Sequence, residues 1–156
     1  MKETVVLLNY MDVLNPLSGG AERYLHEMAK RLASDGYRVV FISASFPGSE
    51  REEKYSGYTI RRIGNLKTVY FFAFFELLRV RGAPLIVESV NAIPFLFTLL
   101  FPVKKVRVFY HVVPYSAIRE KVGNPILSRV VNFLQLAVAP ALYRGKVVTV
   151  SRSSML

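Results

Sequence analysis

Two glycines stand where a short apolar segment gives way to a helical pattern, in the sequence Gly19-Gly20-Ala21-Glu22. Glycines there leave the backbone N–H groups of the first helical turn open to a ligand, and the positive helix end favours an anion such as phosphate. The alternative is a tight turn that needs a positive φ. Spacing alone does not choose between them. No third glycine gives G-x-G-x-x-G spacing and no P-loop lysine follows, so both of those fingerprints are absent.

Two ionisable side chains stand at the ends of apolar segments. His111 follows Val106–Tyr110, and Glu88 lies near the end of Leu85–Ser89. Ligands bind outside the carboxyl ends of strands in open α/β sheets, so both positions suit a functional site, although either side chain could equally be a satisfied structural residue. His26 is interpreted as an exposed residue beside the apolar stripe of the first helix. Two histidines without a cysteine argue against a structural zinc site, and we predict no metal ligands.

Short β-rich segments alternate with longer helical ones, which predicts an α/β fold with a parallel sheet flanked by crossover helices. Strands are expected at Thr4–Asn9, Arg38–Ala44, Tyr58–Ile63, Leu85–Ser89, Val106–Tyr110 and Val147–Val150. Helices are expected at residues 25–34, Lys67–Arg81 and Ile93–Phe101, and from Asn124-Pro125 to about Tyr143 with a kink near Pro140. The polar stretch Pro47–Ser56 is expected to be a surface excursion. We predict a single domain over residues 1–156.

The chain is strongly basic, with 156 residues, a net charge of +10 and 52% hydrophobic residues. Such a charge attracts polyanions, including nucleic acid, acidic lipid and anionic substrates. No nucleic-acid-reading motif is present, so we expect no nucleic-acid partner. The amino terminus has the pattern of a strand and not of a signal peptide, and prolines interrupt the longest apolar stretch, Ala92–Val103. These patterns predict a cytoplasmic protein.

An aromatic segment, Val69–Phe75, is flanked by Lys67, Arg79 and Arg81. A helix of this kind can lie in a bilayer interface, with its rings at the acyl boundary and its cations on lipid phosphates. It can also be buried between the sheet and another element. The first interpretation adds an anionic membrane surface as a partner and predicts peripheral attachment at the inner membrane face.

Several segments together resemble the amino-terminal domain of glycosyltransferase family 4, the retaining GT-B enzymes. They are residues 15–24 (NPLSGGAERY), residues 25–38, Tyr110-His111 and residues 147–153 (VVTVSRS). The resemblance implies a Rossmann-like parallel sheet flanked by helices. It also implies that Gly19 and Gly20 approach the donor diphosphate and that His111 lies beside the transferred sugar as the catalytic-site residue.

The same resemblance assigns Glu22 and Ser151 to the donor side. The loop after His111 would border the acceptor cleft, and the acceptor side as a whole is assigned to Tyr10, Glu88, Asn91, Tyr115 and Arg119. The resemblance implies no bound metal or other cofactor, because the nucleotide sugar is a substrate. The partners implied are therefore a nucleotide sugar and a sugar or lipid-linked acceptor.

The 156 residues do not include the second GT-B domain, whose Arg/Lys pair and E-x7-E segment hold most of the donor. Retaining transfer needs donor and acceptor positioned together between two domains. We therefore expect this chain to be inactive alone and to require a carboxyl-terminal domain or a complementary subunit. The alternative is a non-catalytic Rossmann-like module that binds a partner protein or polyanion through its basic surface.

Overall fold

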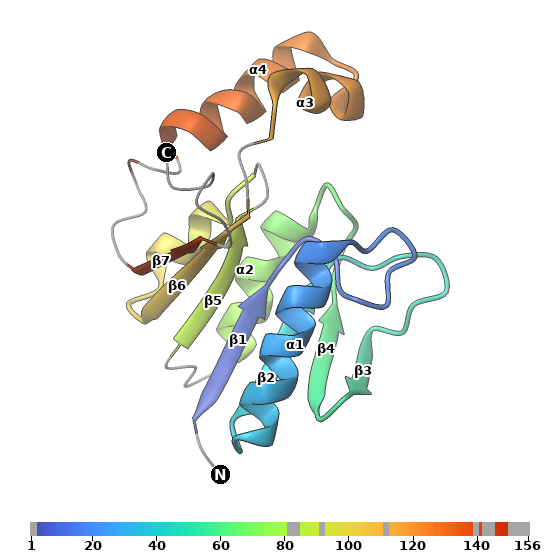
Figure 1. Cartoon of the computed structure of the whole chain (residues 1–156), viewed down its shortest axis with the longest axis vertical. Coiled ribbons are helices and arrows are strands. Elements are labelled where there is room, and N and C mark those ends of the chain that lie inside the picture. The colour runs from blue at the N-terminus through green and yellow to red at the C-terminus, as the bar shows by residue number, and fades with distance from the viewer. Residues whose placement is uncertain are drawn as a thin grey trace.

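The computed structural model describes residues 3–80, 85–90, 93–110, 113–138, 141 and 146–149. The described residues form a seven-stranded sheet in the order β3-β4-β2-β1-β5-β6-β7 (Figure 1). The strands are β1 (Thr4–Leu8), β2 (Arg38–Ser43), β3 (Glu52–Tyr55), β4 (Tyr58–Arg62), β5 (Leu85–Val90), β6 (Lys104–Phe109) and β7 (Lys146–Thr149). Neighbours run parallel except β3 and β4, which are antiparallel. The predicted α/β fold is confirmed.

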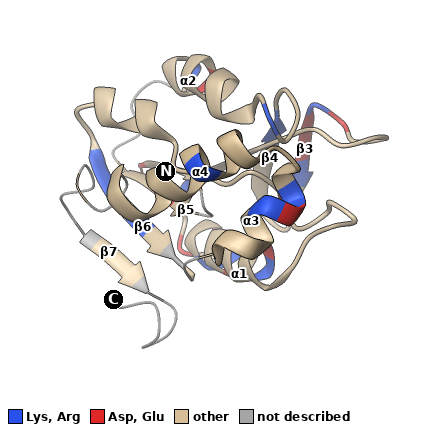
Figure 2. Cartoon of the chain, turned by 90° about the horizontal axis from the view of Figure 1, so that it is seen from above, with Lys and Arg blue, Asp and Glu red and all other residues tan. Residues whose placement is uncertain are grey.

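Successive residues of β1 face opposite sides of the sheet, as the pleat of a strand requires. Val5 and Leu7 pack in a core cluster with α1 (Gly20–Ser34), whereas Val6 and Leu8 pack in a second cluster with α2 (Val69–Arg79). The two helices therefore cover opposite faces of the sheet (Figure 2). Burial on both faces explains why the central strands are mainly apolar in the sequence and do not alternate with polar residues.

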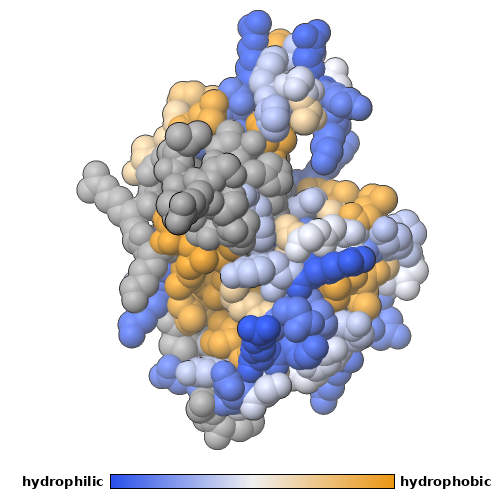
Figure 3. Space-filling model, in the orientation of Figure 1, coloured by the Kyte–Doolittle hydropathy of each residue, from blue (hydrophilic) through white to orange (hydrophobic). Residues whose placement is uncertain are grey.

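The outer faces of α1 and α2 differ in character. Hydrophilic residues cover α1 in the space-filling view (Figure 3). α2 buries Val69, Ala73 and Leu77 but leaves Phe71 and Phe75 exposed. The aromatic segment is therefore buried on one side only. None of the helices in the described part of the chain has the length and apolar character needed to traverse a bilayer.

The prediction that residues 47–56 form only a surface excursion is wrong, because β3 lies within them and pairs with β4. Ser56 (φ 48°) and Gly57 (φ 88°) form the turn, and two successive positive φ values match the twist of a tight hairpin. Charged side chains hide this strand from an apolar pattern, although they suit an exposed edge. The Ser-Gly pair before Tyr58 was the available signal.

Two short helices follow β6 and lie above the carboxyl ends of the parallel strands (Figure 1). They are α3 (Tyr115–Val122) and α4 (Pro125–Phe133), so the prediction of a loop here is wrong. α3 ends at Gly123, which takes a left-handed conformation at φ 72°. The predicted start of the next helix is confirmed, because Asn124 Oδ1 accepts hydrogen bonds from the N–H groups of Ile126 and Leu127.

The last predicted helix is shorter in its α-helical part than expected. A π-helical turn, η2 (Leu134–Val138), follows α4 directly. Pro140 lies outside the described residues; a proline lacks the N–H that would bond the carbonyl four residues earlier, which favours a widened turn ahead of it. The short apolar helix expected at Ile93–Phe101 is a 3-10 helix, η1 (Leu96–Leu100).

Candidate functional site

The glycine loop joins the carboxyl end of β1 to the first turn of α1, at the edge where the parallel strands end (Figure 1). Gly19 caps α1 with extended backbone angles, φ −125° and ψ −154°. Gly20 also has no positive φ, in contrast to Gly36 at φ 87°. Any residue can adopt these conformations. The tight-turn explanation of Gly19 and Gly20 is therefore wrong.

Gly20 borders open space, whereas Gly19 lies against the carboxylate of Glu22. A Cβ atom added to Gly20 meets no atom within 4 Å, and one added to Gly19 would lie 3.6 Å from Glu22 Oε2. The first intrahelical bond of α1 runs from Arg23 N to Gly19 O, so the earlier N–H groups of the helix have no partner within it. Exposed amides at the positive end of a helix form an arrangement that binds phosphate groups.

Glu22 lies behind the glycine loop and is only 2% exposed. Its Oε2 accepts a hydrogen bond from Gly19 N at 2.8 Å, and its Oε1 accepts one from Asn9 Nδ2 at 3.0 Å. Asn9 Nδ2 also donates to the carbonyl of Met11 at 2.8 Å. This position corrects the assignment of Glu22 to donor binding, because the buried carboxylate holds the loop and has almost no surface for a ligand.

A buried ion pair anchors the start of the same loop. Arg62 Nε lies 2.8 Å from Asp12 Oδ2 and Arg62 Nη2 lies 3.1 Å from Asp12 Oδ1, and neither side chain has any exposed surface. Ser43 Oγ donates to Asp12 Oδ2 at 2.7 Å, and Leu14 N donates to Oδ1 at 3.0 Å. Burial alone would lower the pKa of Arg62, but the hydrogen bonds and charges of Asp12 and Glu53 outweigh it and raise that pKa. The β1–α1 loop is thus fastened to the ends of β2 and β4.

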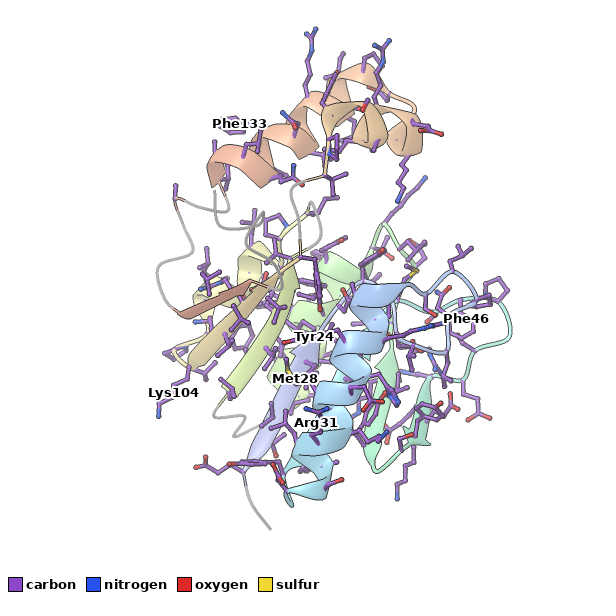
Figure 4. The ribbon with its side chains drawn as sticks, viewed as in Figure 1. Tyr24, Met28, Arg31, Phe46, Lys104 and Phe133 are labelled. Atoms are coloured by element: carbon purple, nitrogen blue, oxygen red, sulfur yellow. The ribbon has the colours of Figure 1, made fainter. Side chains whose placement is uncertain are left out.

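Tyr110 brings the end of β6 to the first turn of α1. Its hydroxyl donates to the carbonyl of Ala21 at 3.3 Å, and its ring meets that of Tyr24 edge to face with centroids 6.0 Å apart. Tyr24 lies on α1 (Figure 4). Burial is the main cause of the raised pKa of the Tyr110 hydroxyl. The sequence predicted that the glycine loop and the end of β6 lie at the same edge of the sheet, and the structure brings them into contact there.

Three predicted site residues lie outside the described residues: His111, Asn91 and Ser151. Their assignments stay predictions. His111 is the next residue after Tyr110 in the chain.

A cavity of about 350 Å³ lies where residues of α3 and α4 meet residues from the carboxyl ends of the strands. It is lined by Tyr10, Tyr70, Ile93, Val113, Pro114, Ala117, Ile118, Lys121, Val122 and Val131. Tyr10 therefore faces a cavity, and burial, followed by the charge of Glu22, raises the pKa of its hydroxyl. Tyr115 and Arg119 are exposed on α3 but do not line the cavity.

The sequence reasoning missed Tyr70 at this cavity. Tyr70 lies in the first turn of α2, one residue before the exposed Phe71. The sequence feature that could have indicated Tyr70 was its position near the start of the predicted helix Lys67–Arg81, which follows a predicted strand. Lys121 also lies in the segment after His111, and it is the one cation among the lining residues of this cavity in the described part of the chain.

Glu88 lies inside β5 and is fully buried, which corrects its assignment to acceptor binding. Its Oε1 accepts from Phe95 N at 2.7 Å, and its Oε2 accepts from Thr98 Oγ1 at 2.9 Å. Arg107 Nε lies 3.7 Å from Oε2. Glu88 has no surface for an acceptor, and its carboxylate fixes η1 against the sheet.

Gln135 holds the segment that precedes α3. Its Oε1 accepts from Val113 N at 2.9 Å, and its Nε2 donates to Val113 O at 3.0 Å. The side chain is 6% exposed and comes from η2. Gln135 falls within the helix predicted to begin at Asn124-Pro125, and its side chain points inward and clamps the backbone after β6.

Replacing Gln135 by alanine is expected to lower the free energy of unfolding by about 1–3 kcal/mol, because it leaves both backbone groups of Val113 without their partner. Urea unfolding measures the loss, and faster hydrogen exchange at the Val113 amide locates it. Asn132→Ala is the matched control, since no hydrogen bond from Asn132 is found in the described part of the chain. Equal losses in the two variants would contradict the clamp.

His26 is not an exposed helix residue, which corrects its interpretation. Its Nδ1 lies 2.8 Å from Tyr58 Oη, and its ring centroid lies 5.3 Å from that of Tyr55 and 5.8 Å from that of Tyr58. Burial lowers the pKa of His26, partly opposed by Glu27. His26 joins α1 to the β3–β4 hairpin.

The lowered pKa of His26 predicts a pH effect on stability. Below about pH 6.5 the unfolded chain binds a proton that the folded chain resists, so the contribution of His26 is present above that pH and is lost as the pH falls. We expect unfolding midpoints of His26→Gln to depend less on pH than those of the unchanged chain over this window. Parallel profiles for the two proteins would contradict the prediction.

The site so far described is typical of α/β proteins that bind a phosphate-bearing ligand at the edge of a parallel sheet. Exposed helix-terminal amides and a cavity lie at the carboxyl edge of a parallel sheet, which is where open α/β sheets bind phosphate-bearing ligands. Among the described residues, no group of three or more His, Asp or Glu side chains is placed to hold a metal ion.

The chain belongs to Glycosyltransferase Family 4, whose family model matches residues 18–153. The solved structure of a sucrose-phosphate synthase from Thermosynechococcus elongatus is similar in fold, with a TM-score of 0.63 and 15% identity. The similarity covers 96% of this chain and 48% of the synthase, so the chain spans about half of that protein.

Another solved structure, the SurE protein of Aquifex aeolicus, is less similar, with a TM-score of 0.40 and 15% identity over 83% of this chain and 60% of that one. No curated protein gives a significant match.

Proposed function

We propose that this chain is the amino-terminal half of a retaining glycosyltransferase that moves a sugar from a nucleotide-sugar donor to an acceptor without a bound metal. The observation that carries the proposal is the glycine loop. Gly19 and Gly20 need no special backbone conformation, and open space lies where a Cβ atom of Gly20 would be. The absence of side chains there is explained by a ligand that comes close to the backbone.

The donor diphosphate fits the first turn of α1. Its amides carry partial positive charge, and the nearby carboxylate of Glu22 faces Gly19 N and Asn9 and not the open space. The same amides stabilise the charge that grows on a departing nucleotide diphosphate. We further propose that His111 lies beside the transferred sugar, because Tyr110 fixes the end of β6 against Ala21. Ser151 is proposed for the donor side on the family pattern alone.

The acceptor is proposed to enter through the cavity beside Tyr10. Its lining is mainly apolar, with the Tyr10 and Tyr70 hydroxyls and the Lys121 ammonium as polar groups. Such a lining suits an acceptor with an apolar part, and a lipid-linked acceptor has one. Tyr115 and Arg119 are exposed on the same helix as Lys121 and are proposed to meet the part of the acceptor outside the cavity.

This half needs a second domain for turnover, because donor and acceptor must be held together between two domains. A carboxyl-terminal domain or a complementary subunit would supply the remaining donor contacts. We expect the purified 156-residue chain to transfer no sugar from any nucleotide sugar. Measurable sugar transfer by the monomer would contradict the proposed need for a second domain.

Binding can be tested without turnover by saturation-transfer NMR on a panel that includes UDP-glucose, GDP-mannose and ADP-glucose. We expect saturation of the sugar and diphosphate-proximal protons of at least one compound, because the glycine loop meets that end of the donor. The free nucleoside is the control and is expected to give a weaker signal. Failure of every nucleotide sugar to bind would contradict the proposed donor role.

A further inference from the structure

The outer face of α2 combines exposed rings with cations. Phe71, Phe72, Phe75 and Leu78 on α2, with Leu66 just before it, expose between 41% and 64% of their surface. The centroids of Phe71 and Phe75 lie 5.4 Å apart, and those of Phe71 and Phe72 lie 5.5 Å apart. We call these five side chains the α2 face. An exposed cluster of this size on a charged protein marks an interaction surface.

Cations border the α2 face at both ends. Lys67 precedes the helix and Arg79 ends it, and Arg79 is 62% exposed although it pairs with Glu76 at 3.1 Å. Beside the face lies a cavity of about 630 Å³, whose lining includes Arg51, Arg79, Phe72 and Phe75.

Within the described residues, neither Arg51 nor Lys67 forms an ion pair, whereas Glu76, which lines the cavity, is paired with Arg61 and Arg79. Glu52 and Glu53 are paired with Arg61 and Arg62, and the exposed Glu50 is the one acidic side chain beside Arg51 in this described segment that forms no ion pair. The available charge at this surface is therefore positive.

We propose that the α2 face is a docking surface for an anionic lipid bilayer. Aromatic side chains prefer the boundary between headgroups and acyl chains, and cations beside them meet lipid phosphates. The net charge of +10 adds a general attraction to such a membrane. α1 on the opposite side of the sheet lacks this combination, because its outer face is hydrophilic (Figures 2 and 3).

The surface also adjoins the proposed acceptor cavity. Tyr70 lines that cavity, and Phe71 and Phe72 follow it on the outer side of the same helix. Docking through α2 would thus hold the cavity near the headgroups, where a lipid-linked acceptor resides. The membrane inference stands on the exposed side chains and their charges, and it does not depend on the proposed transferase activity.

Co-sedimentation of the 156-residue chain with vesicles tests the inference. We expect binding to phosphatidylcholine vesicles that contain phosphatidylglycerol, little binding to phosphatidylcholine alone, and release by salt. Phe71→Ser/Phe75→Ser is expected to weaken binding at least about tenfold. Arg51→Glu/Lys67→Glu is expected to remove the preference for phosphatidylglycerol. Circular dichroism and thermal unfolding verify that each variant is folded.

The matched control is Val130→Ser/Phe133→Ser, which removes two exposed apolar side chains from α4; Phe133 points away from the sheet (Figure 4). This control is expected to bind as the unchanged chain does. The inference is overturned if folded chain fails to sediment with anionic vesicles, if lipid charge has no effect, or if the α4 variant loses as much binding as the α2 variant. In that case a protein partner would be the alternative occupant of the α2 face.

Discussion

Replacing Asp12 by alanine is expected to lower the free energy of unfolding by about 3–5 kcal/mol, because it leaves the Arg62 guanidinium buried without its main partner. Arg62 is fully buried and makes two of its bonds to Asp12, at 2.8 Å and 3.1 Å. The loss is measured by urea unfolding followed by circular dichroism. Asp12→Ala should also loosen the loop that leads to Gly19, which faster amide exchange at Leu14 would report.

Two further variants separate this buried pair from ordinary surface charge. Glu27→Ala breaks an exposed pair with Lys30 and is expected to change the free energy of unfolding far less, because solvent screens exposed charges. Asp12→Ala/Arg62→Met removes both buried charges and is expected to recover much of the loss, since an apolar pair can replace a buried ion pair. A loss from Asp12→Ala no larger than that from Glu27→Ala would contradict the role of the pair.

Replacing Gly20 by valine is expected to weaken nucleotide-sugar binding by at least about tenfold, or roughly 1.4 kcal/mol, while the fold stays intact. A Cβ atom at this position meets no atom of the chain within 4 Å and needs no strained backbone, so we expect the valine side chain to extend into the space proposed for the donor. Gly20→Ala should have a smaller effect of the same sign. Saturation-transfer NMR compares binding, and thermal unfolding tests the fold.

Stability provides the control for Gly20. Removal of a glycine from a helix end is expected to leave the unfolding temperature unchanged or to raise it slightly. Lys30→Val places the same valine side chain on the outer face of α1, far from the glycine loop. This variant should leave nucleotide-sugar binding unaffected. Donor binding by Gly20→Val equal to that of the unchanged chain would contradict the proposed approach of the diphosphate to the loop.

Periodicity and composition predicted most of the fold because the central strands are buried on both faces. The segments at β1, β2 and β5 are mainly apolar, and the stripe of Leu25, Met28, Ala29 and Leu32 marks α1. β3 was missed because its four residues are mostly charged and their pairing depends on the Ser56-Gly57 turn. Edge strands carry little apolar signal, since only one of their sides contributes to the core.

The candidate site was predictable in its place but not in its contacts. A glycine loop and a strand end can be assigned to one sheet edge from their order in the chain. Whether a carboxylate at that edge faces a ligand depends on its partners. Glu22 and Glu88 both have the right sequence position, yet backbone N–H groups of Gly19 and Phe95 hold their oxygens. Gln135 lies 22 residues from Val113, so its clamp has no local signal.

The most direct test of the account is a titration of the isotope-labelled chain with nucleotide sugars, followed by the shifts of its backbone amides. We predict that Gly20 and Ala21 shift together with Tyr110 and Val113 for at least one donor, because Tyr110 at the end of β6 donates a hydrogen bond to the carbonyl of Ala21 in the first turn of α1. Amides at the far end of α1, such as Ser34, should stay unchanged. Amide shifts confined to other surfaces, or the absence of shifts at the glycine loop, would contradict the proposed donor site.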